Sequence, residues 1–202
     1  TKSVSFPVDT SRANQEAVLD VIRQDVPPGT YHLTMTLRDV LSGRVGRLKR
    51  DVEIEPYGLD KLKLSDLMLV KSVSDTIRDV RFRRGAQEVT PNPKRQYKTP
   101  QDLAFYCEVY NLQKNEFGQT NYKVTTAVKA VDERAGFRPF GANEQPEVAL
   151  SFEQVGDQNW ERLPLAVDLA NAQPGRNRLI VIIEDLVSGQ SISKETSFEY
   201  IR

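Results

Sequence analysis

The sequence holds one histidine and one cysteine, the side chains that most often serve as a general base and as a thiol nucleophile. His32 falls on the polar side of a stretch that alternates between polar and apolar residues, and no Gly-x-Ser-x-Gly turn is present to support a Ser-His-Asp triad. Cys107 shares the apolar side of another alternating stretch with Leu103, Phe105 and Val109, which predicts a buried, unreactive thiol. The sequence therefore predicts no catalytic residue, and a hydrolase built on His32 is the enzymatic alternative.

The sequence contains few residues that could hold a metal ion or a cofactor. One histidine and one cysteine cannot form a zinc site of the usual spacing, and neither glycine-rich phosphate-binding motif occurs. Asp157, Asn159 and Glu161 alternate as oxygen ligands of calcium could, but the central glycine and the late glutamate of an EF-hand are missing. We therefore expect a polar hairpin there, no metal site and no cofactor.

The densest charge cluster lies in residues 78–98, where seven basic side chains face only two acidic ones. The basic residues are Arg78, Arg81, Arg83, Arg84, Lys94, Arg95 and Lys98. Phe82 and Tyr97 are interleaved with them, which is typical of some polyanion-binding sites. The other interpretation is a strand whose Val80 and Phe82 point inward and whose arginines decorate its solvent face. Because the whole chain balances 28 basic against 28 acidic residues, we expect no nucleic-acid partner.

Two segments of the chain repeat each other at a constant spacing of 146 residues. Residues 28–54 and 174–200 share Pro, Gly, Leu, Asp, Ser, Gly and Glu at equivalent positions without a gap. Both begin at a Pro-Gly turn, alternate with a period of two, pass through a Ser-Gly turn and alternate again. This pattern predicts a β-hairpin in each copy, with glycine supplying the positive φ of the turn.

The two copies differ on their outward faces. Ile180 and Ile182 stand where the first copy has Thr34 and Thr36, so the outward face of the second copy is apolar. An apolar outward face needs a cover. A loop at residues 132–147 is the favoured cover, and a neighbouring domain or a partner subunit at Ile180 and Ile182 is the alternative.

Regular short strands separated by proline and glycine turns predict an all-β fold. We expect tandem immunoglobulin- or fibronectin-like antiparallel β-sandwiches, with residues 58–202 forming a complete one. Residues 1–57 would form the closing half of another sandwich whose opening strands precede Thr1. A competing possibility is that this segment adds strands to the main sandwich. No apolar stretch approaches the roughly 20 residues that cross a bilayer, which predicts no transmembrane span.

Several short strand and turn motifs occur along the chain, namely Leu64-Ser65-Asp66, Pro91-Asn92-Pro93, Phe105 to Leu112 and the two Pro-Gly to Ser-Gly hairpins. Together they resemble the C-terminal β-rich part of GWxTD domain-containing bacterial proteins. The Gly-Trp-x-Thr-Asp motif itself is absent. The resemblance implies an exported protein of the periplasm or cell surface, with other envelope or extracellular proteins as partners in a larger complex. We therefore expect a non-enzymatic structural or protein-interaction module, and a carbohydrate- or polyanion-binding module as the alternative.

Overall fold

The computed structural model describes residues 19–131 and 148–202, and over these residues the chain is an all-β protein. The one helical element among them is a short 3-10 turn, η1 (Val80–Phe82). Nowhere in this part of the chain is there a helix long and apolar enough to cross a membrane. Residues 1–18 of the predicted first domain and the predicted covering loop, 132–147, lie outside the described residues.

Thirteen strands are described in this part of the chain. In order they are β1 (Gly29–Arg38), β2 (Val45–Ile54), β3 (Lys63–Leu64), β4 (Met68–Ser74), β5 (Arg83–Arg84), β6 (Gln87–Pro91), β7 (Gln96–Lys98), β8 (Leu103–Tyr110), β9 (Thr120–Ala130), β10 (Val148–Gly156), β11 (Trp160–Val167), β12 (Gly175–Asp185) and β13 (Ser191–Ile201). The chain divides into two compact units. We call Ile22–Asp60 the hairpin unit, and Lys61–Arg202 together with Thr1–Val21 the sandwich unit.

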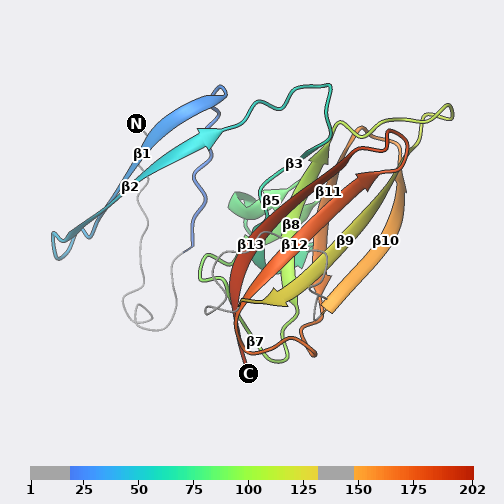
Figure 1. Ribbon diagram of the computed structural model, residues 1–202. Coiled ribbons are helices and arrows are strands. Elements are labelled where there is room, and N and C mark those ends of the chain that lie inside the picture. Colours follow the sequence, from blue (N-terminus) through green and yellow to red (C-terminus); the bar gives the residue numbers. More distant parts are fainter. Residues whose placement is uncertain (1–18, 132–147) are drawn as a thin grey trace. The chain divides into compact units, whose positions relative to one another are not determined.

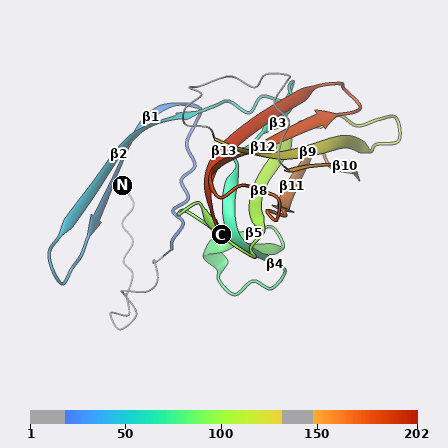
Figure 2. The ribbon, with the colours of Figure 1, turned by 60° about the horizontal axis from the view of Figure 1, so that its bottom comes forward.

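The sandwich unit consists of two sheets packed face to face, as Figure 2 shows from the rotated view. One sheet has the strand order β10-β9-β12-β13-β7. The other has the order β11-β8-β4-β6-β5, and β3 also pairs with β8. All neighbouring strands are antiparallel except β13 and β7, which run parallel over three residue pairs. The prediction of an antiparallel all-β sandwich is confirmed.

The core of the sandwich unit is built from the inward rows of the two sheets. In β8 the alternating residues Leu103, Phe105, Cys107 and Val109 are all fully buried, as the sequence pattern predicts. The facing sheet contributes buried side chains from β9, β12 and β13, among them Tyr122, Val124, Val128, Leu179, Val181, Ile183, Phe198 and Tyr200. Period-two alternation therefore locates this core correctly, because successive strand residues point to opposite faces.

The hairpin unit holds a two-stranded sheet formed by β1 and β2, drawn in blue and cyan in Figure 1. Its ten residue pairs run from Gly29 opposite Ile54 to Arg38 opposite Val45. Neither strand belongs to a sheet of the sandwich unit. The described sheets therefore do not contain the alternative arrangement, in which this segment adds strands to the main sandwich. The predicted domain boundary between residues 57 and 58 stays a prediction.

One segment departs from the strand interpretation of the basic residues 78–98. The residues around Val80 form η1 instead of a strand, and Val80 is 73% exposed while Phe82 is buried. The prediction that Val80 points inward is therefore wrong. Asp79 is the reason, since its Oδ1 accepts the Arg81 N–H at 3.0 Å and caps a helical turn.

Candidate functional site

The two repeated hairpins turn through the same Asp-x-x-Ser-Gly sequence, at Asp39–Gly43 and Asp185–Gly189. In each turn the aspartate Oδ1 accepts the backbone N–H two residues later at 3.0 Å, and its carbonyl accepts the glycine N–H at 2.8 Å. The serine hydroxyl donates to the aspartate Oδ2 in both. The glycines have φ of 70° and 73°, which glycine adopts without steric cost. The sequence repeat is therefore also a structural repeat.

The apolar rows of the two hairpins differ in burial. In β12, Leu179, Val181 and Ile183 are fully buried in the core. The equivalent residues of β1 are exposed: 45% of Leu33, 47% of Met35 and 73% of Leu37. On β2, Leu48 on the same face is 55% exposed. We call the face formed by Tyr31, Leu33, Met35, Leu37, Leu48, Val52 and Ile54 the apolar hairpin face.

Ile180 and Ile182, the predicted interaction surface, lie on the outer face of β12. Ile180 is 6% exposed, and its neighbours across the sheet are Ala127 on β9 and Glu195 on β13. Ile182 is half-buried. Of the two, Ile182 therefore has the larger surface for a partner, and the role of both residues as an interaction surface stays a prediction.

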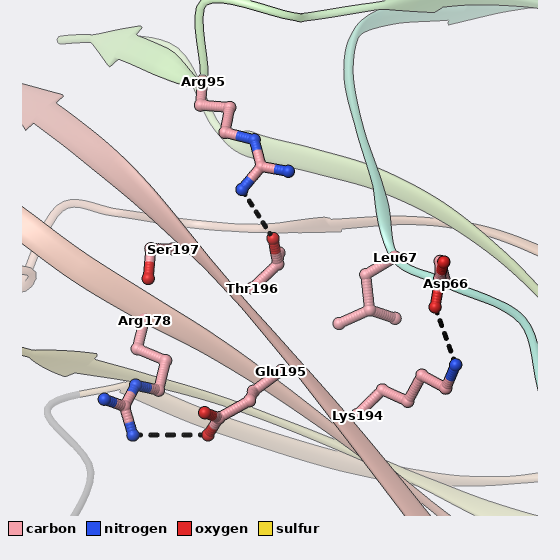
Figure 3. A pocket seen from close by; sticks show the side chains of 8 residues that line it. All are labelled: Asp66, Leu67, Arg95, Arg178, Lys194, Glu195, Thr196 and Ser197. Atoms are coloured by element: carbon pink, nitrogen blue, oxygen red, sulfur yellow. Dashed lines mark hydrogen bonds and ion pairs between the residues drawn. The ribbon is translucent and has the colours of Figure 1, made fainter. Parts of the chain in front are cut away.

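A cleft of about 370 Å³ runs beside the first half of β13, and Figure 3 shows the side chains that line it. They are Asp66, Leu67, Arg95, Arg178, Lys194, Glu195, Thr196 and Ser197. Three side-chain contacts join the residues that line the cleft. Lys194 Nζ lies 2.7 Å from Asp66 Oδ1, Arg178 Nη1 lies 3.3 Å from Glu195 Oε2, and Arg95 Nη1 donates to Thr196 Oγ1 at 3.3 Å. The cleft is therefore polar, with three cations against two carboxylates.

Arg95 has an unusual backbone in this cleft. Its φ of 54° lies in the left-handed region that L-residues seldom adopt. Two hydrogen bonds hold it there, because its N–H donates to the Asn92 carbonyl at 3.0 Å and its carbonyl accepts the Glu199 N–H at 2.8 Å. The guanidinium is thereby presented beside β13, where an anionic group entering the cleft would meet it.

The other predicted polyanion-binding residues are dispersed. Arg83 and Arg84 lie in β5 at the end of one sheet, while Lys98 lies in β7 at the end of the other. Arg81 forms ion pairs with Asp79 at 2.7 Å and with Asp20 at 3.3 Å. Arg78 and Lys94 are exposed, and of the seven basic residues Arg95 alone lines the cleft.

The two aromatic residues of the basic segment do not present their rings to solvent. Phe82 is 8% exposed and Tyr97 is 3% exposed. The Tyr97 hydroxyl lies 2.9 and 2.7 Å from the carbonyl oxygens of Val70 and Ala104, to either of which it can donate, and burial raises the pKa of Tyr97 to about 12. A stacking contact from these two rings to a bound polyanion therefore lacks an accessible surface.

Sequence reasoning missed a polar network on the outer face of the second sheet. Tyr106 and Tyr110 both donate their hydroxyls to the Glu108 carboxylate between them on β8. Arg162 on β11 lies 3.9 Å from Glu108 Oε1, and its guanidinium lies 4.4 Å from the centroid of the Trp160 ring. Burial and the neighbouring Glu108 raise the pKa of Tyr106. The Tyr-x-Glu-x-Tyr spacing is the signal, since it places all three residues on one face of a strand.

His32 and Cys107, the two residues whose side chains most often act in catalysis, lie in different settings. Cys107 is fully buried, and desolvation, aided by the charge of Glu108, raises the pKa of its thiol to about 12. A thiol with that pKa stays protonated at neutral pH and is a poor nucleophile. His32 pairs through Nδ1 with Asp51 across the hairpin, and the two side chains are 86% and 74% exposed. That exposed pair offers no enclosed pocket for a substrate.

Within residues 19–131 and 148–202, no group of three or more His, Cys, Asp or Glu side chains is arranged to hold a metal ion. Asp157 and Asn159 lie in the turn between β10 and β11, and Glu161 is in β11.

No protein-family model matches the chain, and the search of curated proteins found none with significant similarity. The resemblance to GWxTD domain-containing proteins therefore stays an expectation.

Proposed function

We propose that the chain is a non-enzymatic structural and protein-interaction module of a bacterial envelope or extracellular assembly. We further infer that its two units derive from tandem sandwiches of the immunoglobulin or fibronectin type. One observation carries the interaction role. The apolar hairpin face has the residue pattern and strand register of the buried β12–β13 hairpin, yet Leu33, Met35 and Leu37 are about half exposed or more. The envelope location follows from the family resemblance.

Physical arguments support a partner for this face. A two-stranded hairpin alone is marginally stable in water, and large contiguous apolar surfaces on soluble proteins mark interaction sites. The opposite face of the same hairpin is polar, with Thr30, His32, Thr34 and Thr36 on β1. This two-sidedness is the pattern of an antiparallel sheet that covers something with one side only.

Cross-linking mass spectrometry of the natural protein in its own cells tests the interaction role. We expect Lys49, the one lysine of the hairpin unit, to cross-link reproducibly to one or two other proteins. Leu33→Arg places a charge in the apolar hairpin face and should abolish these links, while Thr34→Arg on the polar face should keep them. An absence of protein neighbours despite good lysine coverage would contradict the proposal.

The cleft beside β13 favours a second candidate function, the binding of an anionic ligand. Arg95, Lys194 and the Thr196 hydroxyl converge there, and charged donors of this kind bind carboxylates and sulfates. On a heparin column at low salt, retention of the native chain and its loss in Arg95→Ala would support this function. Arg78→Ala, an exposed arginine outside the cleft, is the matched control. No retention of the native chain would remove this candidate.

A further inference from the structure

The β1–β2 and β12–β13 hairpins are equivalent residue by residue. Each of the ten pairs from Gly29 opposite Ile54 onward corresponds, 146 residues later, to a pair from Gly175 opposite Tyr200 onward. A side-chain contact is repeated as well. The Tyr31 hydroxyl donates to the carbonyl four residues earlier at 2.7 Å, and at the equivalent position the Asn177 amide does so at 2.8 Å. The contacts that surround the buried β12–β13 hairpin therefore indicate which contacts the exposed β1–β2 hairpin could make. We call the β12–β13 hairpin the template.

Besides the short parallel pairing of β7 with the last residues of β13, three contacts surround the β12–β13 hairpin. Strand β9 pairs antiparallel with β12 along Asn177–Asp185. The inward row packs in one core with β8 residues of the facing sheet. At the turn, the Gln113 N–H donates to Asp185 Oδ2 at 3.0 Å and the Leu186 N–H donates to the Asn121 carbonyl at 2.8 Å. These contacts leave Asp185 1% exposed.

The equivalent positions of the β1–β2 hairpin are open. Among the described residues β1 is paired with β2 alone, so its other edge, from Tyr31 to Asp39, carries no strand. Leu33 and Leu37 are exposed where their equivalents are fully buried, and Asp39 is exposed where Asp185 is buried. An edge, a face and a turn are thus open at the three places where the template is covered.

We propose that the β1–β2 hairpin docks a β-sheet of another polypeptide, which replaces what β9 and β8 give to the β12–β13 hairpin. One strand of the partner pairs antiparallel with β1 along Tyr31–Asp39, as peptides do when they add to a sheet edge. An apolar strand of the partner covers the apolar hairpin face, and a backbone N–H reaches the carboxylate of Asp39. This inference rests on the proposed function, because it names the kind of partner that the interaction module takes.

Two differences between the hairpins define the chemistry of the partner. Arg50 stands at the position of Thr196, which in the sandwich unit meets the guanidinium of Arg95. The partner therefore needs a carboxylate at the place of Arg95, so that Arg50 meets an opposite charge. Leu48 stands at the position of Lys194, which pairs with Asp66. An apolar side chain is therefore expected at the place of Asp66.

A photo-cross-linking residue on either face of β1 tests this inference in the natural full-length protein in its own cells. p-Benzoylphenylalanine is placed at Leu37, which is 73% exposed on the apolar hairpin face, or at Thr36 on the polar face as the control. We expect an adduct with one polypeptide from position 37 and none from position 36. The captured polypeptide, once purified, should slow hydrogen exchange at alternate amides of β1, because an added strand bonds to alternate residues.

Affinity measurements with the same purified polypeptide complete the test. Leu33→Arg and Leu37→Arg should each weaken its binding about 30-fold or more, as the loss of a central interface contact does. Thr34→Arg should change the dissociation constant by less than about threefold, as for a residue outside the contact.

The outcomes separate this inference from the proposed function. A captured polypeptide that leaves the β1 amides unprotected and binds Leu33→Arg normally would overturn the docking model and leave an interaction module. Adducts from position 37 to any other part of the same polypeptide, to a second copy or to lipid would also overturn it. In that case lysine cross-links to other proteins would still support the proposed function, and their absence would sink both.

Discussion

Leu179→Ala is expected to lower the free energy of unfolding of the sandwich unit by about 3–4 kcal/mol, since it empties a fully buried leucine site. Leu179 lies in the middle of β12, between β9 and β13, where the surrounding strands cannot easily collapse into the space. Urea unfolding followed by tryptophan fluorescence measures the loss. Trp160, the one tryptophan of the chain, lies in β11 of the same unit.

The repeat supplies the matched control, because Leu33 is the same residue type at the equivalent position of β1. Leu33 is 45% exposed, so Leu33→Ala removes much less buried area and should cost less than about 1 kcal/mol. Equal costs for the two substitutions in the isolated chain would contradict the exposure of the apolar hairpin face. A cost below about 1 kcal/mol for Leu179→Ala would contradict its place in the core.

Asp185→Ala is expected to destabilise the sandwich unit by about 3 kcal/mol, because it removes the charge-assisted bonds of a buried carboxylate and leaves partly buried donors without their acceptor. The carboxylate accepts the N–H groups of Val187 and Gln113 at 3.0 Å each and the Ser188 hydroxyl at 2.6 Å. The Gln113 bond joins this turn to the loop after β8. Chemical denaturation and the loss of amide protection at Gln113 measure the effect.

Asp39→Ala is the control for the bond between the turn and the neighbouring loop. Asp39 makes the same bonds within its own turn, but it is exposed, so water replaces the lost acceptor. The midpoint of unfolding reported by Trp160 should change much less than in Asp185→Ala. If the two variants lost the same stability, the bond from Gln113 would contribute nothing and the turn alone would account for the effect.

The fold could be predicted from the sequence wherever the local residue pattern agrees with what the packing of the folded protein requires. The period-two rows of Leu103 to Val109 and Leu179 to Ile183 predict buried strand faces, and both are buried. The Ser-Gly turns predict both hairpins, since glycine is needed where φ is positive. At Val80 the same alternation fails, because the cap of Asp79 stabilises a helical turn that the pattern of apolar residues does not encode.

The candidate sites were less predictable, because they depend on what lies beside each strand. Alternation identifies the apolar side of β1 but does not say whether anything covers it. The basic segment looked like one cluster along the chain, yet its residues end in two different sheets and only Arg95 reaches the cleft. Nothing in an arginine residue predicts a φ of 54°; strand β13 imposes it through the Glu199 N–H.

The closed turn of each hairpin has a consequence for the order of folding. The bonds that close the turn join residues within one six-residue segment, from Asp185 to Gln190 in the second copy, so they can form before the bonds to Gln113 and Asn121 are made. Hairpins close in about 1–10 μs, whereas β9 must find β12 across a long intervening chain. We therefore expect substitution of the turn aspartate to slow folding, and substitution of a core residue such as Leu179 mainly to speed unfolding. We thus expect the Asp-x-x-Ser-Gly turn to start folding in both units. In the hairpin unit, the β1 edge would then be formed before a strand of the partner pairs with it.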